Sequence, residues 1–137
     1  MINPPRLRVL YIEDNALVRE ITCDLLAGDA REIVAVATGE EALCAFEERP
    51  FDIVVTDVSL PAMSGFELVR RVKQLAPSTP VILASGYPLN IEECRLGSQV
   101  RAITKPFDAP ELEALIADLC GSAAKAPAAG SGPPRQA

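Results

Sequence analysis

The chain has 137 residues, about half of them apolar, and a formal net charge of −6. This length suits one domain with one sizeable core. An acidic balance without a run of Lys or Arg argues against nucleic acid as a partner, and no apolar stretch reaches the roughly 20 residues that cross a bilayer. Histidine is absent, which excludes a His-based catalytic triad and a His metal site.

Short apolar runs recur along the chain and are typical of buried strands. In chain order they cover residues 7–12, 33–37, 51–56, 81–84 and 100–104. The first four are separated by segments that have apolar residues at helical spacing, a shorter and weaker segment precedes the fifth, and another helical segment follows it. This alternation predicts an α/β fold with a five-stranded parallel sheet. The doubly wound order 2-1-3-4-5, as in flavodoxin-like folds, fits five such strands and places a ligand crevice at their carboxyl ends.

Helix starts are marked by polar residues that have Glu three positions later, the spacing of a capping box. These pairs are Thr38 with Glu41, Ser64 with Glu67, Asn90 with Glu93, and Asp108 with Glu111. The first helix carries its apolar stripe from Leu17 to Leu25 and ends at Gly28. The helix near Asn90 is expected to be short and to end at Leu96. The last helix is stopped by Gly121.

The predicted domain organisation has three parts. Residues 1–6 form a short arm, residues 7–121 one folded domain, and residues 122–137 a disordered tail rich in Ala, Pro and Gly. We expect no effector domain. The start of the chain lacks the apolar core of a secretory signal, and the four cysteines are far apart. We therefore expect free thiols and a cytoplasmic protein.

Four of the five predicted strands end in a polar side chain. Glu13 and Asp14 follow the first strand, Asp57 the third, Ser85 the fourth and Lys105 the fifth. Because parallel strands end at one edge, these groups meet there. Three carboxylates repel one another unless a cation lies among them, and oxygen ligands of this kind suit Mg²⁺. Asp57 could then accept a phosphoryl group, with Lys105 and the Ser85 hydroxyl contacting its oxygens.

Over residues 7–120 the chain resembles the receiver domains of two-component response regulators. The resemblance rests on Tyr11-Ile12-Glu13-Asp14-Asn15, on Val54–Pro61 with Gly65, on Leu83–Tyr87, and on Thr104-Lys105-Pro106-Phe107. It implies that Asp57 is the phosphoacceptor from a histidine kinase or a histidine phosphotransfer protein. It also implies that Glu13, Asp14, Asp57 and the backbone carbonyl of Ser59 hold Mg²⁺. A cis Lys105–Pro106 bond is a further implication.

One position departs from that family. Receivers usually carry Tyr or Phe three positions before the lysine, as a switch that moves with the hydroxyl residue, but here the position is Ala102. Tyr87 could take over the movement or could simply cover the rim of the site. The expected output is protein contact, with an unknown output protein and without nucleic acid or membrane.

Alternatives remain for the whole protein. A stand-alone regulator is the preferred interpretation, and a receiver of a hybrid histidine kinase is the alternative. A haloacid dehalogenase-like phosphatase is a distant alternative, because that family needs a second Asp two positions after the nucleophile and this chain has Ser59 there. We predict no enzyme in the turnover sense, only phosphoryl uptake from a donor and slow self-catalysed loss.

Overall fold

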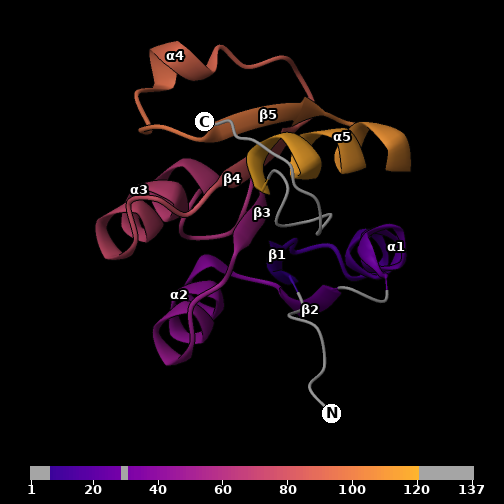
Figure 1. Ribbon diagram of the computed structural model, residues 1–137, viewed down its shortest axis with the longest axis horizontal. Coiled ribbons are helices and arrows are strands. Elements are labelled where there is room, and N and C mark those ends of the chain that lie inside the picture. Colours follow the sequence, from indigo (N-terminus) through magenta and orange to yellow (C-terminus); the bar gives the residue numbers. More distant parts are fainter. Residues whose placement is uncertain (1–6, 29–30, 121–137) are drawn as a thin grey trace, which may run out of the picture.

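The computed structural model describes residues 7–28 and 31–120, which form a parallel sheet between helices (Figure 1). The strands are β1 (Leu7–Ile12), β2 (Arg31–Val36), β3 (Ile53–Asp57), β4 (Val81–Ser85) and β5 (Val100–Thr104). Their order across the sheet is β2-β1-β3-β4-β5, and every pair is parallel. The predicted fold class and strand order are confirmed.

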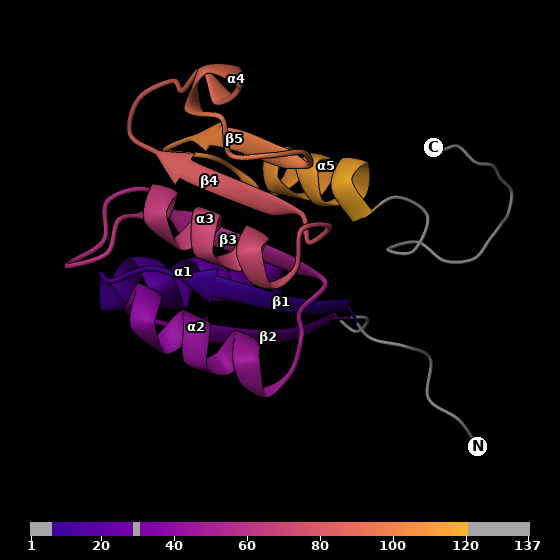
Figure 2. The same ribbon diagram turned by 90° about the vertical axis from the view of Figure 1, so that its left-hand side faces the viewer.

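Helices cover both faces of the sheet. They are α1 (Ala16–Leu26), α2 (Gly39–Glu48), α3 (Gly65–Leu75), α4 (Ile91–Cys94) and α5 (Ala109–Cys120). Figures 1 and 2 show α2 and α3 on one face and α1 and α5 on the other, with α4 beyond the β5 edge. None of the helices among the described residues is long and apolar enough to span a bilayer.

The predicted capping residues begin the helices. Asp108 and Glu111 form a reciprocal box, in which each backbone N–H donates to the other's carboxylate at 3.1 and 2.9 Å. The Thr38 hydroxyl accepts from the backbone N–H of Glu41 at 3.1 Å. Ser64 caps α3 in the same way at 3.2 Å. These local contacts satisfy backbone donors at helix ends that have no partner within the helix.

Several strand boundaries differ from those predicted by one or two residues, β3 covering Ile53–Asp57 rather than 51–56 and β4 ending at Ser85 rather than at residue 84, and two boundaries have a clear cause. Strand β2 begins at Arg31 rather than at residue 33, because its charged first residues have partners. The Arg31 guanidinium donates to the Glu113 carboxylate at 2.8 Å and to the Leu26 carbonyl at 2.9 Å. Helix α4 ends at Cys94 rather than at Leu96, since the next residue has a left-handed backbone with φ 52°.

The core has two layers because strand side chains alternate between the faces of the sheet. On β1, Leu10 and Ile12 pack under α2 and α3, whereas Val9 and Tyr11 pack under α1 and α5. All four are buried. Burying one such aliphatic side chain stabilises the fold by about 1.5–3 kcal/mol, so both layers hold the sheet in place.

Arginine side chains tie the amino end of the sheet to its surroundings. Arg8 on β1 donates to the Glu32 carboxylate on β2 at 2.6 Å, and its guanidinium carbon lies 4.3 Å from the centre of the Phe51 ring. The Arg31–Glu113 contact joins β2 to α5. Ion pairs therefore connect β1, β2 and α5 at the amino end of the sheet.

The terminal segments, the cysteines and the Lys105–Pro106 bond were also predicted from the sequence. The predicted arm, residues 1–6, and tail, residues 122–137, lie outside the described residues. All four cysteines are free thiols, as expected. The Lys105–Pro106 peptide bond is cis, as the resemblance implied.

Candidate functional site

The carboxyl edge of the sheet brings three charged side chains to one side. Glu13 follows β1, Asp57 ends β3 and Lys105 follows β5. Each stands two positions after a core residue that packs under α1 and α5, and these core residues are Tyr11, Val55 and Ile103. The period of two along a strand therefore directs all three charged groups to the same side of the rim.

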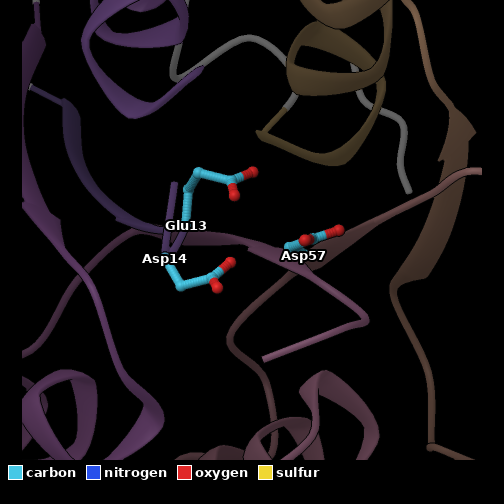
Figure 3. A group of neighbouring side chains, drawn as sticks. All are labelled: Glu13, Asp14 and Asp57. Atoms are coloured by element: carbon cyan, nitrogen blue, oxygen red, sulfur yellow. The ribbon is translucent and has the colours of Figure 1, made fainter. Parts of the chain in front are cut away.

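Glu13, Asp14 and Asp57 form a cluster of carboxylates (Figure 3). Each offers an oxygen atom that lies within 4.8 Å of the oxygens of the other two. Glu13 and Asp57 are buried, whereas Asp14 is exposed. Carboxylate oxygens in this arrangement suit a hard divalent cation, and mutual repulsion favours the cation-bound state.

Lys105 lies between two of these carboxylates. Its Nζ is 3.1 Å from Glu13 Oε1 and 3.2 Å from Asp57 Oδ1. Burial alone would lower the pKa of Lys105, but its hydrogen bonds to Glu13 and Asp57 and their negative charge outweigh burial and raise it. The ammonium is therefore charged at neutral pH. An ammonium beside a buried carboxylate can neutralise an anion that reaches that carboxylate.

Neighbouring residues fix the position of Glu13. Its Oε2 accepts the backbone N–H of Asn15 at 3.1 Å, and its carbonyl accepts Nη1 of Arg19 at 2.7 Å. Asn15 also caps α1 by accepting the N–H of Val18. Arg19 was not among the site residues predicted from the sequence. Its position one turn into α1, six residues after the acid, is the only signal that could have indicated it.

The predicted hydroxyl residue, Ser85, is buried at the end of β4. Its carbonyl accepts the backbone N–H of Lys105 at 2.7 Å, which places it beside the lysine. Its hydroxyl oxygen accepts the backbone N–H of Tyr87 at 3.1 Å. The Tyr87 side chain is 59% exposed, and Ser59 is exposed in the loop after β3. The structure therefore links Ser85 to Tyr87 through its hydroxyl oxygen and to Lys105 through its backbone carbonyl.

Gly65 packs closely against the backbone of Asp57 and Val58. Its backbone N–H donates to the Val58 carbonyl at 2.8 Å. A Cβ atom at this position would lie 2.3 Å from the carbonyl oxygen of Asp57 and 2.9 Å from the Cα of Val58. Only glycine permits this close approach. Gly65 was named from the sequence only as part of the resemblance to receivers, because its contact with Asp57 depends on the path of the loop before α3.

Comparison with known proteins identifies the family. The family model described as "Response regulator receiver domain" matches residues 9–117. The chain is 34% identical over 113 residues to "Response regulator protein FleR" of Pseudomonas aeruginosa, an alignment that covers 80% of this chain and 24% of that protein. The chain thus spans about a quarter of that relative's length.

Solved structures share the fold. A receiver domain from Methylobacillus flagellatus has a TM-score of 0.73 and 28% identity, and the match covers 83% of this chain and 98% of that one. The receiver domain of sensor histidine kinase PA1611 from Pseudomonas aeruginosa, solved with a magnesium ion coordinated in its active site cleft, has a TM-score of 0.75. It is 22% identical, with coverage of 85% of this chain and 99% of that one. The chain belongs to the response regulator receiver domain family.

Proposed function

We propose that this chain is a phospho-acceptor that takes a phosphoryl group onto Asp57 from a phospho-histidine donor. The observation that carries the proposal is the buried Asp57 carboxylate, which lies 3.2 Å from the Lys105 ammonium at the rim of the sheet. A carboxylate oxygen of Asp57 attacks phosphorus, and the bond between phosphorus and the donor nitrogen breaks. The electron pair of that bond stays on the imidazole, and an acyl phosphate forms.

The surrounding side chains act on the oxygens of the phosphoryl group. Lys105 neutralises charge on one oxygen as it develops. The Ser85 hydroxyl donates its proton to another oxygen, because a hydroxyl can donate while its oxygen still accepts. The Lys105 contact with Glu13 holds the ammonium beside Asp57 before the phosphoryl group arrives.

The acidic cluster fits a Mg²⁺ ion. Glu13, Asp14 and Asp57, with the backbone carbonyl of Ser59, would hold it. This proposal is supported by three carboxylates that lie close together at the rim of the sheet, of which Asp14 is exposed to solvent. When bound, the ion supplies positive charge that offsets repulsion between these carboxylates and the incoming phosphoryl group.

The face of α1 next to the site is suited to docking of the donor. Leu17 and Ile21 are 65% and 52% exposed there. Beside them lies a hollow of about 400 Å³, which is lined by Thr22 and three apolar residues of α1 and by Lys105, Pro106 and Phe107. An exposed apolar surface that borders a reactive group is suited to a protein partner. We propose that a histidine kinase or a histidine phosphotransfer protein docks here.

We further propose a stand-alone regulator in the cytoplasm that signals through protein contact. A receiver segment of a hybrid histidine kinase is the alternative. The acidic charge of the chain supports a protein output rather than nucleic acid. In either case the phosphoryl group leaves again by slow attack of water on the acyl phosphate, without turnover of a separate substrate.

A phosphotransfer profile tests the acceptor. The chain is incubated with Mg²⁺ and each radiolabelled histidine kinase or phosphotransfer protein of the host, and transfer is followed over time. We expect fast, Mg²⁺-dependent labelling that Asp57→Asn abolishes and Glu47→Gln, on the exposed side of α2 and away from α1, leaves intact. Equal labelling of Asp57→Asn and the parent would refute Asp57 as the acceptor.

A second experiment tests the docking face. Ile21→Asp should slow transfer from the protein donor at least tenfold, a loss of about 1.4 kcal/mol, while labelling by acetyl phosphate stays unchanged. Leu75→Asp is the matched control, because Leu75 is 50% exposed on α3, away from this face. Equal slowing by both variants would contradict docking on α1.

A further inference from the structure

The loop between β3 and α3 is fixed at both ends. At its start, the backbone N–H of Val58 donates to the Ala84 carbonyl at 2.9 Å, and the Val58 carbonyl accepts the N–H of Gly65 at 2.8 Å. At its end, the Ser64 hydroxyl caps α3. Between these points the loop carries Ser59, whose carbonyl belongs to the proposed Mg²⁺ site. The residues that hold the middle of the loop therefore determine where that carbonyl lies.

The middle of the loop contains a strained turn. The backbone N–H of Met63 donates to the Pro61 carbonyl at 2.7 Å, and Ala62 between them has φ 65°. A hydrogen bond across three residues with a positive φ at the centre is the rare, strained form of the γ-turn. Such a backbone conformation persists only where the surroundings hold it. Pro61 and Ala62 are exposed, so Met63 is the residue of this turn through which the fold can hold it.

Met63 anchors the turn to the start of α2. Gly39 is the first residue of α2 and is buried. A Cβ atom on Gly39 would lie 2.9 Å from Met63 Sδ and 3.3 Å from both Cβ and Cγ of Met63. The Met63 side chain, from its first carbon to its sulfur, therefore lies directly on the glycine. It also packs against the core layer under α2 and α3, which lie side by side on one face of the sheet (Figure 2).

We infer that Met63, through its contact with Gly39, is a positioning residue for the metal site. The contact holds the strained turn and thereby fixes the Ser59 carbonyl beside the acidic cluster. The inference rests on the proposed Mg²⁺ site and adds the residues that set its affinity. Three residues separate Ser59 from Met63. Among them, Pro61 has its φ fixed by its ring, and Ala62 is held by the hydrogen bond across it, so a shift of Met63 is passed along the loop.

Two substitutions disturb this contact from opposite sides. Gly39→Ala places a methyl group where Met63 lies, and Met63→Ala removes the side chain. Affinity for Mg²⁺ is measured from the Mg²⁺-dependent shifts of backbone amide signals in ¹H–¹⁵N NMR spectra of the full chain, which also show that each variant is folded. We expect each variant to bind Mg²⁺ roughly tenfold more weakly than the parent. Met63→Leu, which keeps an apolar side chain of similar volume, should bind almost as tightly as the parent.

Matched controls separate this role from a general loss of stability. Gly28→Ala makes the same chemical change where nothing lies within 4 Å of the Cβ position. Leu43→Ala truncates a half-buried side chain that packs against the same core layer but belongs to α2. Both should bind Mg²⁺ as the parent does, although Leu43→Ala lowers the unfolding temperature. If Leu43→Ala weakened binding as much as Met63→Ala, the effect would come from stability and the inference would be wrong.

The double variant Gly39→Ala/Met63→Ala tests whether the two residues act through one contact. Once the Met63 side chain is gone, the methyl group at position 39 has little left to displace. We therefore expect the double variant to bind Mg²⁺ about as weakly as Met63→Ala alone. A loss equal to the product of the two single losses would show two independent effects and would overturn the inference.

The same titrations separate the inference from the proposed function. Asp57→Asn should weaken Mg²⁺ binding if the acidic cluster holds the ion. If the parent and Asp57→Asn bind Mg²⁺ equally, the cluster is not the site, and the proposed metal site and the inference fail together. If Asp57→Asn weakens binding while Gly39→Ala and Met63→Ala bind as the parent does, only the inference fails.

Discussion

Gly65→Ala tests how closely the start of α3 supports Asp57. The new Cβ would lie 2.3 Å from the Asp57 carbonyl oxygen, and ordinary contact begins at 3.4 Å, so one side must move by 3.4 − 2.3 = 1.1 Å. The nearest atoms are backbone, which yields less easily than a side chain. Overpacking of this kind costs about 1–3 kcal/mol of folding free energy. A displacement of about 1 Å at a reacting group can slow a reaction on the order of 100-fold.

Two assays follow from these magnitudes. Urea unfolding should show Gly65→Ala destabilised by about 1–3 kcal/mol, and labelling by acetyl phosphate should slow on the order of 100-fold. Gly28→Ala is the matched control, because nothing lies within 4 Å of its Cβ position. Parent-like stability and labelling rate in Gly65→Ala would show that the loop adjusts freely and that the contact does not position Asp57.

Three further predictions concern charge, backbone strain and pH. Asp14→Asn removes one of three neighbouring carboxylates. In the absence of Mg²⁺, thermal unfolding should therefore show the variant to be more stable than the parent by about 0.2–1 kcal/mol. If adding Mg²⁺ stabilised the variant as much as it stabilises the parent, a role of Asp14 in holding the ion would be contradicted. Ala62 has φ 65°, so Ala62→Gly should stabilise the fold by about 0.5–1 kcal/mol in urea unfolding, and a loss would refute strain there. Burial raises the pKa of the Cys120 thiol from 9.0 to about 11. Between these pH values the folded state keeps a proton that the unfolded state loses, so the free energy of unfolding should fall as pH rises from 9 toward 11. Cys120→Ala should flatten that fall between pH 9 and 10, and an unchanged slope would exclude this thiol as its source.

The strand pattern predicted both the sheet and the rim. The apolar runs before Glu13, Asp57 and Lys105 are parallel strands, and parallel strands end at the same edge of the sheet. Because side chains alternate along a strand with a period of two, the three charged groups also lie on the same side of that edge. The start of β2 was wrong because Arg31 and Glu32 belong to the strand only through distant partners, Glu113 and Arg8. The apolar periodicity of the sequence gives no information on contacts between residues so far apart.

Other features of the site depend on side-chain length and loop path. Glu13 accepts a hydrogen bond from Lys105, 92 positions later in the sequence, and the Ser85 hydroxyl oxygen accepts the backbone N–H of Tyr87. An open surface hollow beside Ala102 is lined by residues 88–92, next to the short helix α4. The sequence showed that an aromatic residue was missing at position 102, but only coordinates show the space that remains.

The arginine contacts at the amino end of the sheet make its two ends unequal. Arg8 and Arg31 join β1, β2 and α5 where the strands begin, whereas carboxylates crowd together where they finish. A change of charge at Asp57 should therefore alter amide hydrogen exchange mainly near the carboxyl edge and leave exchange near Arg8 and Arg31 unchanged. A modification at Asp57 would thus act at one end of the sheet, while the arginine contacts hold the strands together at the other end.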